Sequence, residues 1–196
     1  MKNLSLNKIL EQVWKAIKDG IKDGSSSFHI FTISTINLQG YPSSRSIVIR
    51  SLNQAKRIIS FNTDTRSNKW KELETNSQLG LHFYDSKFKI QIRISGSAKL
   101  YYNDLEWEKA WNESEEMSKI YYSSLFSPNS KIDDPMETDN LIKNIKRKQI
   151  EKGKKNFGKI NVKINKIDWL YLLHTGHRRA VFKFHKNNIS MSWIAP

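Results

Sequence analysis

Residues 63–69, which read TDTRSNK, form the densest group of polar and basic side chains in the chain. They follow a β-rich run and precede a short amphipathic run, so we expect them at a strand end and a helix start. Arg66, Ser67 and Lys69 would then place cations, a hydroxyl and helix N-terminal amides within one turn. A phosphate dianion is stabilised there, because free N–H groups and the helix dipole both favour negative charge. An ordinary helix cap with solvated charges is the alternative interpretation.

Arg45 and Arg50 bracket the apolar interior of a predicted strand, RSIVIR. Strict alternation sends these two arginines to opposite faces of a sheet. One site can use both only if the strand bends or if each face serves a different part of the site. Surface charge on an edge strand is the alternative.

Gln91 lies among isoleucines in the run KIQIRISG, with Arg93 on the same predicted face. An amide both donates and accepts hydrogen bonds, which suits the ring edge of a flavin or a nucleobase. A generic polar residue on a solvated sheet face is the alternative.

The turn GHRR, residues 176–179, carries His177 close to His174. Two imidazoles without cysteine or nearby carboxylates make a weak zinc site, so no metal is expected. The chain has no GxSxG, no P-loop and no glycine-rich dinucleotide fingerprint, and its carboxylates show no distinguishing spacing. Hydrolase classes are therefore unsupported, and no catalytic residue is assigned.

The elements that must position these residues read as strands on both sides of a helical insertion. A helix is expected at 5–23, with Ser5 as its N-cap, a short helix at 67–73, and a helical insertion at about 103–152 that contains a loop at 127–138. Strands are expected at 28–36, 44–52, 57–63, 79–85, 89–102, 157–164, 168–174, 178–185 and 189–194, with a turn at Asn165-Lys166. Hairpin-length connections favour an antiparallel barrel or sandwich with added helices, in one domain over 1–196.

The length, the cysteine content and the charge of the chain exclude several classes of protein. The chain has 196 residues, no cysteine and a formal net charge of +14. Disulfide frameworks, thiolate metal sites and thiol nucleophiles are excluded, and no apolar run reaches the ~20 residues of a membrane helix. A cytoplasmic location and no membrane partner are expected. The basic excess is concentrated in residues 143–155, which we interpret mainly as a solvated basic segment; nucleic acid is the alternative partner, not the expected one.

Six segments taken in order resemble the pyridoxamine 5'-phosphate oxidase-like family. They are RSIVIR (45–50), SFNTDTRSNKWKELETN (60–76), HFYDSKFKIQIRISGSAKL (82–100), NFGKINV (156–162), IDWLYLLHTGHRRAVF (167–182) and SWIAP (192–196). The similarity spans about residues 28–196 and is closer to the FMN-binding relatives than to the oxidase itself.

The resemblance implies a mainly β fold with added helices, an antiparallel six-stranded split β-barrel. It also implies a homodimer with FMN at the subunit interface. Arg45 and Lys69 match the basic residues that hold the FMN phosphate, Gln91 matches the residue at the flavin edge, and Arg179 matches an arginine near the partner's flavin. The other cofactor positions implied are Ser46, Ile47, Val48, Arg50, Asn62, Thr63, Ser67, Asn68 and Trp169. Arg50 and His177 match residues on the substrate side.

Three departures bear on the substrate. The segment EKAWNESEEMSK (108–119) lacks the arginine of the oxidase's substrate-phosphate site, Thr175 replaces another arginine, and Asn68 replaces a basic residue. We therefore expect an FMN-dependent oxidoreductase acting on an unidentified small molecule. True pyridoxamine/pyridoxine 5'-phosphate oxidase activity and a flavin-binding module without its own turnover are the alternatives.

Overall fold

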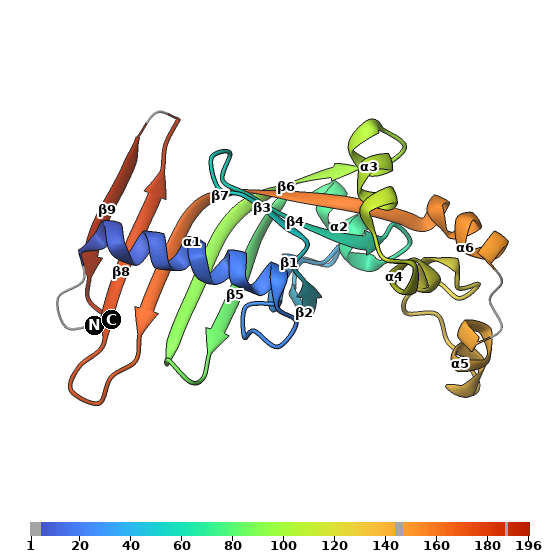
Figure 1. Ribbon diagram of the computed structural model, residues 1–196, viewed down its shortest axis with the longest axis horizontal. Coiled ribbons are helices and arrows are strands. Elements are labelled where there is room, and N and C mark those ends of the chain that lie inside the picture. The colour runs from blue at the N-terminus through green and yellow to red at the C-terminus, as the bar shows by residue number, and fades with distance from the viewer. Residues whose placement is uncertain (1–4, 144–146, 187) are drawn as a thin grey trace. The chain divides into compact units, whose positions relative to one another are not determined.

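The computed structural model describes residues 5–143, 147–186 and 188–196, without the side chains of 140–143, 147 and 148. The chain divides into two compact units, which we describe separately (Figure 1). Unit 1 comprises Met1–Phe61, Ser77–Lys99 and Asn161–Pro196, and unit 2 comprises Asn62–Asn76 and Leu100–Ile160.

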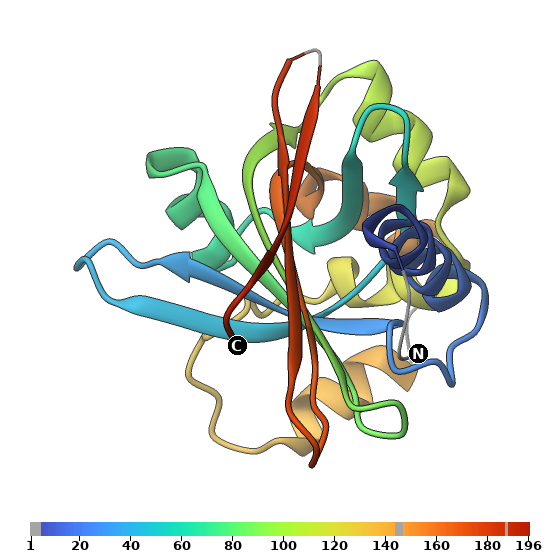
Figure 2. The same cartoon turned by 90° about the vertical axis from the view of Figure 1, so that its left-hand side faces the viewer.

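One antiparallel sheet organises unit 1. Its strands are β1 (Ile30–Ile36), β2 (Pro42–Val48), β3 (Ser51–Asn53), β4 (Ile58–Asp64), β5 (Gln78–Asp85), β6 (Ile90–Tyr101), β7 (Phe157–Tyr171), β8 (Arg178–Phe184) and β9 (Ile189–Ile194). The order is β2-β1-β5-β6-β7-β4-β3, and β8 pairs with β7 and β9. Among the described residues the sheet thus has nine strands, three more than the six expected for the barrel. The β8–β9 hairpin is the long ribbon in the foreground of Figure 2.

The predicted strand 44–52 changes partners at its centre. Ile49 N donates to His29 O at 3.0 Å, whereas Arg50 N donates to Ser60 O at 2.9 Å. Strand β2 pairs with β1, and β3 pairs with β4. Residues 49–50 therefore join the two ends of the strand order and curl the sheet. The strand bends at Arg50, which is the condition under which Arg45 and Arg50 can escape strict alternation.

The turn expected at Asn165-Lys166 is absent, because β7 runs without interruption through both residues. Lys166 already pairs with Lys183 of β8, so the ladder continues where the sequence indicated a turn. The alternation of buried residues changes phase here: Val162 and Ile164 are buried before it, and Ile167 and Trp169 after it.

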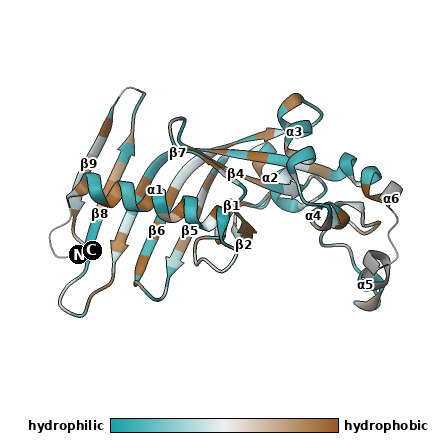
Figure 3. Cartoon of the chain, viewed as in Figure 1, coloured by the Kyte–Doolittle hydropathy of each residue, from teal (hydrophilic) through white to brown (hydrophobic). Residues whose placement is uncertain are grey.

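Helix α1 (Leu6–Lys22) lies across the strands β5 to β9 in Figure 1. Ser5 caps it, since its side chain accepts a hydrogen bond from Lys8 N. Apolar and polar residues alternate along it at helical spacing (Figure 3), and its buried residues include Ile9, Val13 and Ile17. In the described part of the chain, no helix combines the length and the apolar character that crossing a membrane requires.

Short helices make up most of unit 2. They are α2 (Asn68–Thr75), α3 (Leu105–Glu113), α4 (Glu116–Ile120), α5 (Met136–Lys143) and α6 (Arg147–Lys152), with 3-10 turns η1 (Tyr121–Ser123) and η2 (Gly153–Asn156). Trp111 and Phe157 form the core of this unit, with ring centroids 5.3 Å apart. The sequence also indicates a basic helix from about 139 to 152. The structure has α5 and α6 there, and residues 144–146 lie outside the described residues. The mainly β fold with added helices is confirmed.

Candidate functional site

Thr63, Ser67 and Lys69 converge at the junction that the sequence indicated, between the end of β4 and the start of α2. The Lys69 ammonium donates to the hydroxyl of Thr63 and lies 3.4 Å from Ser67 Oγ. Both hydroxyl residues are buried, at 3% and 4% exposure. An ammonium and a threonine hydroxyl that share one small space form a donor set suited to phosphate oxygens.

Ser67 occupies the N-cap position of α2 as expected, but its side chain makes no capping hydrogen bond. Its Oγ donates instead to Asp64 O at 2.6 Å. The hydroxyl is thereby turned toward Thr63 and Lys69 rather than toward the first turn of the helix.

Arg66 is engaged elsewhere, so the expectation that it adds a cation to this cluster is wrong. Its guanidinium forms an ion pair with Asp64 at 2.6 Å and donates to Ser124 O at 3.0 Å. The residue therefore neutralises a carboxylate and tethers the segment after η1, and Lys69 is left as the cation of the cluster.

Contacts within unit 2 hold this junction in place. Thr65 N donates to Asn156 O at 2.8 Å. Trp70 lies against Gly158 so closely that a Cβ built there would be 2.3 Å from the indole. Asn62 Nδ2 donates to Ser114 Oγ at 3.2 Å, and Asn68 is exposed on α2. Glycine at 158 is thus required for α2 to approach β7.

Arg45 lies on β2 in unit 1 and is only partly exposed. Its guanidinium donates to the hydroxyl of Thr35, to Ser43 O at 3.0 Å and to Ser43 Oγ at 2.9 Å. Along the same strand, Ser46 is exposed, and Ile47 and Val48 are half-buried. A shared site with the Lys69 cluster, which belongs to unit 2, stays a prediction.

The face of the sheet that carries Gln91 also carries an ionic cluster. Gln91 pairs with Tyr84, and Arg93, two residues on, pairs with His82. Asp168 accepts from Arg93 Nη2 at 2.9 Å, from Arg179 Nε at 3.0 Å and from Arg179 Nη2 at 2.9 Å. Gln91, Arg93 and Arg179 are therefore brought to one face by three neighbouring strands.

Asp168 is 5% exposed, so its carboxylate is taken almost wholly out of water. Burial alone would raise the pKa of Asp168, but the hydrogen bonds and charges of Arg179 and Arg93 outweigh it and lower the pKa. The same carboxylate raises the pKa of Arg179. The cluster therefore stays ionised, with two cations around one anion.

The importance of Asp168 was missed in the sequence. The available signal was an acid inside the apolar run KIDWLYL, where a buried carboxylate requires basic partners. Its partners lie on two other strands, and only the strand order identifies them.

Trp169 points to the other face, because it follows Asp168 on the same strand. It is 3% exposed and lines a cavity of about 470 Å³ together with Val13 of α1 and Ile90 and Ile92 of β6. Within unit 1 this face is opposite to that of Gln91. A contact between Trp169 and the flavin stays a prediction. The position of Trp169 on the face opposite to that of Gln91 argues against it.

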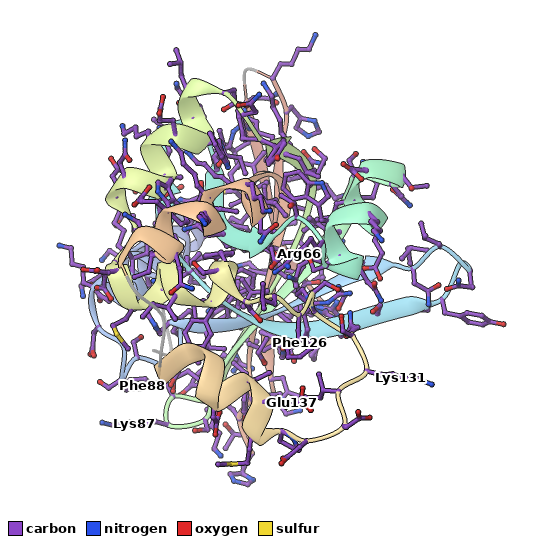
Figure 4. The ribbon with its side chains drawn as sticks, turned by 90° about the vertical axis from the view of Figure 1, so that its right-hand side faces the viewer. Arg66, Lys87, Phe88, Phe126, Lys131 and Glu137 are labelled. Carbon is purple, nitrogen blue, oxygen red and sulfur yellow. The ribbon has the colours of Figure 1, made fainter. Side chains whose placement is uncertain are left out.

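His177 lies in the β7–β8 turn, at the margin of a cleft of about 810 Å³. Its Nδ1 accepts from Leu173 N at 3.1 Å, so in the neutral ring the proton is on Nε2. The cleft is also lined by Tyr84, Lys87, Phe88, Lys89 and His174. Figure 4 labels Lys87 and Phe88 on the turn between β5 and β6.

Comparison with known proteins shows similarity to one family. Residues 11–102 match the family model described as pyridoxamine 5'-phosphate oxidase, FMN-binding domain. The pyridoxine/pyridoxamine 5'-phosphate oxidase of Pseudoalteromonas atlantica is 31% identical over 86 residues, which cover 44% of this chain and 39% of that protein. Its namesake from Flavobacterium johnsoniae is 33% identical over 76 residues, which cover 39% of this chain and 35% of that protein. These matches span well under half the length of either relative.

Two solved structures share the fold of this protein over nearly the whole chain. A pyridoxamine 5'-phosphate oxidase-related, FMN-binding protein from Nostoc punctiforme superposes with a TM-score of 0.78 at 18% identity, covering 95% of this chain and 96% of that one. PhzG from Burkholderia lata, in complex with tetrahydrophenazine-1-carboxylic acid, superposes with a TM-score of 0.75 at 20% identity, covering 97% and 92%. The split-barrel fold and the resemblance to this FMN-binding family are confirmed.

Proposed function

Since residues 11–102 match the FMN-binding domain of the pyridoxamine 5'-phosphate oxidase family, we propose that this protein is an FMN-dependent oxidoreductase acting on a small molecule. The observation that carries the proposal is the convergence of Thr63, Ser67 and Lys69, all within the matched residues.

The donor set of this cluster fits a phosphate ester. Lys69 supplies a positive charge and Thr63 a hydroxyl donor, whereas the Ser67 hydroxyl donates to Asp64 O and Arg66 is paired with the Asp64 carboxylate. Burial of the Thr63 hydroxyl strengthens its hydrogen bond to an anion, because the local dielectric constant is low. Lys69 and Thr63 would hold the phosphate of FMN, and the family resemblance assigns Arg45 to an FMN phosphate as well.

Gln91 supports a place for the planar ring on its face of the sheet. Its amide donates and accepts, as the pyrimidine edge of a flavin requires. Arg93 and Arg179 supply positive charge on the same face. Bound FMN would supply the redox chemistry, and the protein's residues bind it, orient it and stabilise negative charge. No general acid or base is needed for hydride transfer, which agrees with the absence of an assigned catalytic residue.

A homodimer is part of the proposal, with FMN at the subunit interface and Arg179 of one protomer near the flavin of its partner. The family resemblance supports this arrangement. Sedimentation of the FMN-loaded protein would test it.

The cleft beside His177 supports a small anionic substrate. Lys87, Lys89 and His174 surround it with basic groups, and Tyr84 and Phe88 offer aromatic faces. Tyr84 pairs with Gln91 across the strands, so the cleft adjoins the position proposed for the ring. Arg50 and His177 are the residues proposed on the substrate side.

The spectrum of the purified protein tests the cofactor directly. We expect yellow protein with flavin absorption, or stoichiometric uptake of FMN by the apoprotein in a fluorescence titration. Riboflavin, which lacks the phosphate, should bind much more weakly. Protein that takes up no FMN would end the proposal.

True pyridoxamine/pyridoxine 5'-phosphate oxidase activity is the second candidate, because the curated relatives carry that name. The absence of arginine from residues 108–119 argues against a substrate-phosphate site there. An oxidase assay with pyridoxamine 5'-phosphate decides between the two. FMN that no donor, NAD(P)H included, can reduce would favour a flavin-binding module without turnover.

A further inference from the structure

Asp168 accepts hydrogen bonds from two arginines on neighbouring strands, and the proposed function assigns no role to this carboxylate. Its carboxylate binds Arg179 through both Nε and Nη2, and Arg93 through Nη2. Three strands contribute one residue each: β6 carries Arg93, β7 carries Asp168 and β8 carries Arg179. The side chain of Asp168 is buried, whereas those of Arg93 and Arg179 are 45% and 25% exposed. The anion therefore lies beneath two cations that reach the surface.

The geometry fixes the orientation of Arg179, which contacts the carboxylate at two points, and tethers Arg93 to the same carboxylate through one hydrogen bond. A side-on, two-point contact leaves a planar guanidinium little freedom to rotate. Within the described part of the chain, Nη1 of Arg179 and Nη1 of Arg93 make no hydrogen bond. Each arginine therefore keeps donors for a ligand while the carboxylate holds its other side.

The charges of the cluster do not cancel, since two arginines and one aspartate leave a formal charge of +1. Both cations lie on the face that carries Gln91, whose partner Tyr84 lines the cleft. Such a face is prepared in advance for negative charge, so no reorganisation of the side chains is needed when that charge appears.

We propose that Asp168 is a positioning residue that holds Arg93 and Arg179 as a paired-cation receptor for the negative charge on the pyrimidine edge of reduced flavin. This inference rests on the proposed function, because it requires FMN at the subunit interface, with Gln91, Arg93 and Arg179 of one protomer facing the ring of the FMN whose phosphate the partner holds. It assigns Asp168 and Arg93 a role that family resemblance did not give them.

The midpoint potential of bound FMN distinguishes two roles of Asp168: holding the two arginines in position, or acting only through its own negative charge. Asp168→Asn removes a negative charge. If the arginines stayed in place, the field would become more positive, the reduced ring would be stabilised and the potential would rise. If Asp168 positions them, its loss lets the guanidinium groups turn to water, and the potential falls. The two accounts thus predict opposite signs.

We expect potentials in the order wild type, Asp168→Glu, Asp168→Asn, from highest to lowest, measured by equilibrium dye reduction of the FMN-loaded full chain. The dissociation constant of FMN should rise about tenfold or more in Asp168→Asn, equivalent to one charge-assisted hydrogen bond. Asp85→Asn is the matched control: Asp85 is also buried on this sheet, but it alternates with Tyr84 and faces the other side. Its potential should equal that of the wild type.

A potential that rises or stays unchanged in Asp168→Asn would overturn the inference, as would a glutamate variant that recovers none of the shift. If Asp168→Asn fails to fold, Asp168→Glu decides alone: a potential below that of the wild type supports positioning, and an equal potential contradicts it. Wild-type protein that binds no FMN would instead refute the proposed function.

Discussion

The backbone amides of Ile49 and Arg50, adjacent in the chain, donate to two separate segments, to His29 O at 3.0 Å and to Ser60 O at 2.9 Å. One strand therefore ends its pairing with β1 and begins pairing with β4 within a single peptide unit. The Ile49 side chain is 1% exposed at this junction. The sheet therefore curls at Ile49, where the backbone changes its pairing partner and the side chain is packed in the core.

Replacing Ile49 by alanine should destabilise the protein by about 2–5 kcal/mol, because a fully buried side chain is removed where the sheet bends. Urea unfolding measures the change. Ile30→Ala is the control, since Ile30 is 53% exposed on the adjacent β1, and its effect should stay within about 0.5 kcal/mol. Equal losses in the two variants would contradict this account of the junction.

Replacing Lys69 by alanine should weaken FMN binding by roughly 10–100-fold, the equivalent of one charge-assisted hydrogen bond of about 1.5–3 kcal/mol. Fluorescence titration of apoprotein with FMN gives the dissociation constants. Lys71→Ala removes the same charge from the exposed side of α2 and should bind FMN nearly as the wild type does. If both variants lose affinity equally, the effect is one of net charge and not of this cluster.

Replacing Gly158 by alanine should disturb the cluster of Thr63, Ser67 and Lys69 by displacing helix α2. The new Cβ would lie 2.3 Å from the ring of Trp70, so α2 must shift away from β7. We expect a loss of about 1–3 kcal/mol in unfolding free energy, as for other overpacked sites, together with weaker FMN binding. Thermal unfolding and the FMN titration are the measurements. Gly24→Ala has open space around it and should change neither; normal FMN binding by Gly158→Ala would show that α2 is not held by this contact.

The lowered pKa of Asp168 predicts how stability depends on pH. Because the pKa in the folded state lies below the ordinary value of 3.8, the ionised group stabilises the fold at pH above that value. This contribution is lost as the pH falls through the lowered pKa. Asp168→Asn should therefore be less stable than the wild type at neutral pH, and the difference should shrink in acid.

Urea unfolding of both proteins between neutral pH and about pH 3 tests this dependence. Glu113→Gln, which removes an exposed partner of Lys109, should follow the wild-type curve throughout. If the unfolding free energies of Asp168→Asn and the wild type change in parallel across the acid range, the ionisation of Asp168 does not contribute to the pH dependence of stability.

The strands were predictable wherever one face is buried, as in β6, where Ile92 and Ile94 alternate with Arg93. The turn at Asn165-Lys166 failed as a prediction because turn residues are only a local preference. Pairing of Lys166 with Lys183 supplies the backbone with partners and overrides it. The convergence of Thr63, Ser67 and Lys69 was predictable because they are close in sequence. The hydrogen bond from Arg66 to Ser124 O was not, since Ser124 lies far along the chain.

By itself the sequence determined most of the helices and strands, the polar junction after β4 and the faces of Gln91 and Arg93, because each depends on neighbours a few residues apart. Only the tertiary structure decided that Asp168 lies between Arg93 and Arg179. A buried carboxylate must find its compensating charges across neighbouring strands, and strand order is set by the packing of the whole sheet rather than by any local run of residues.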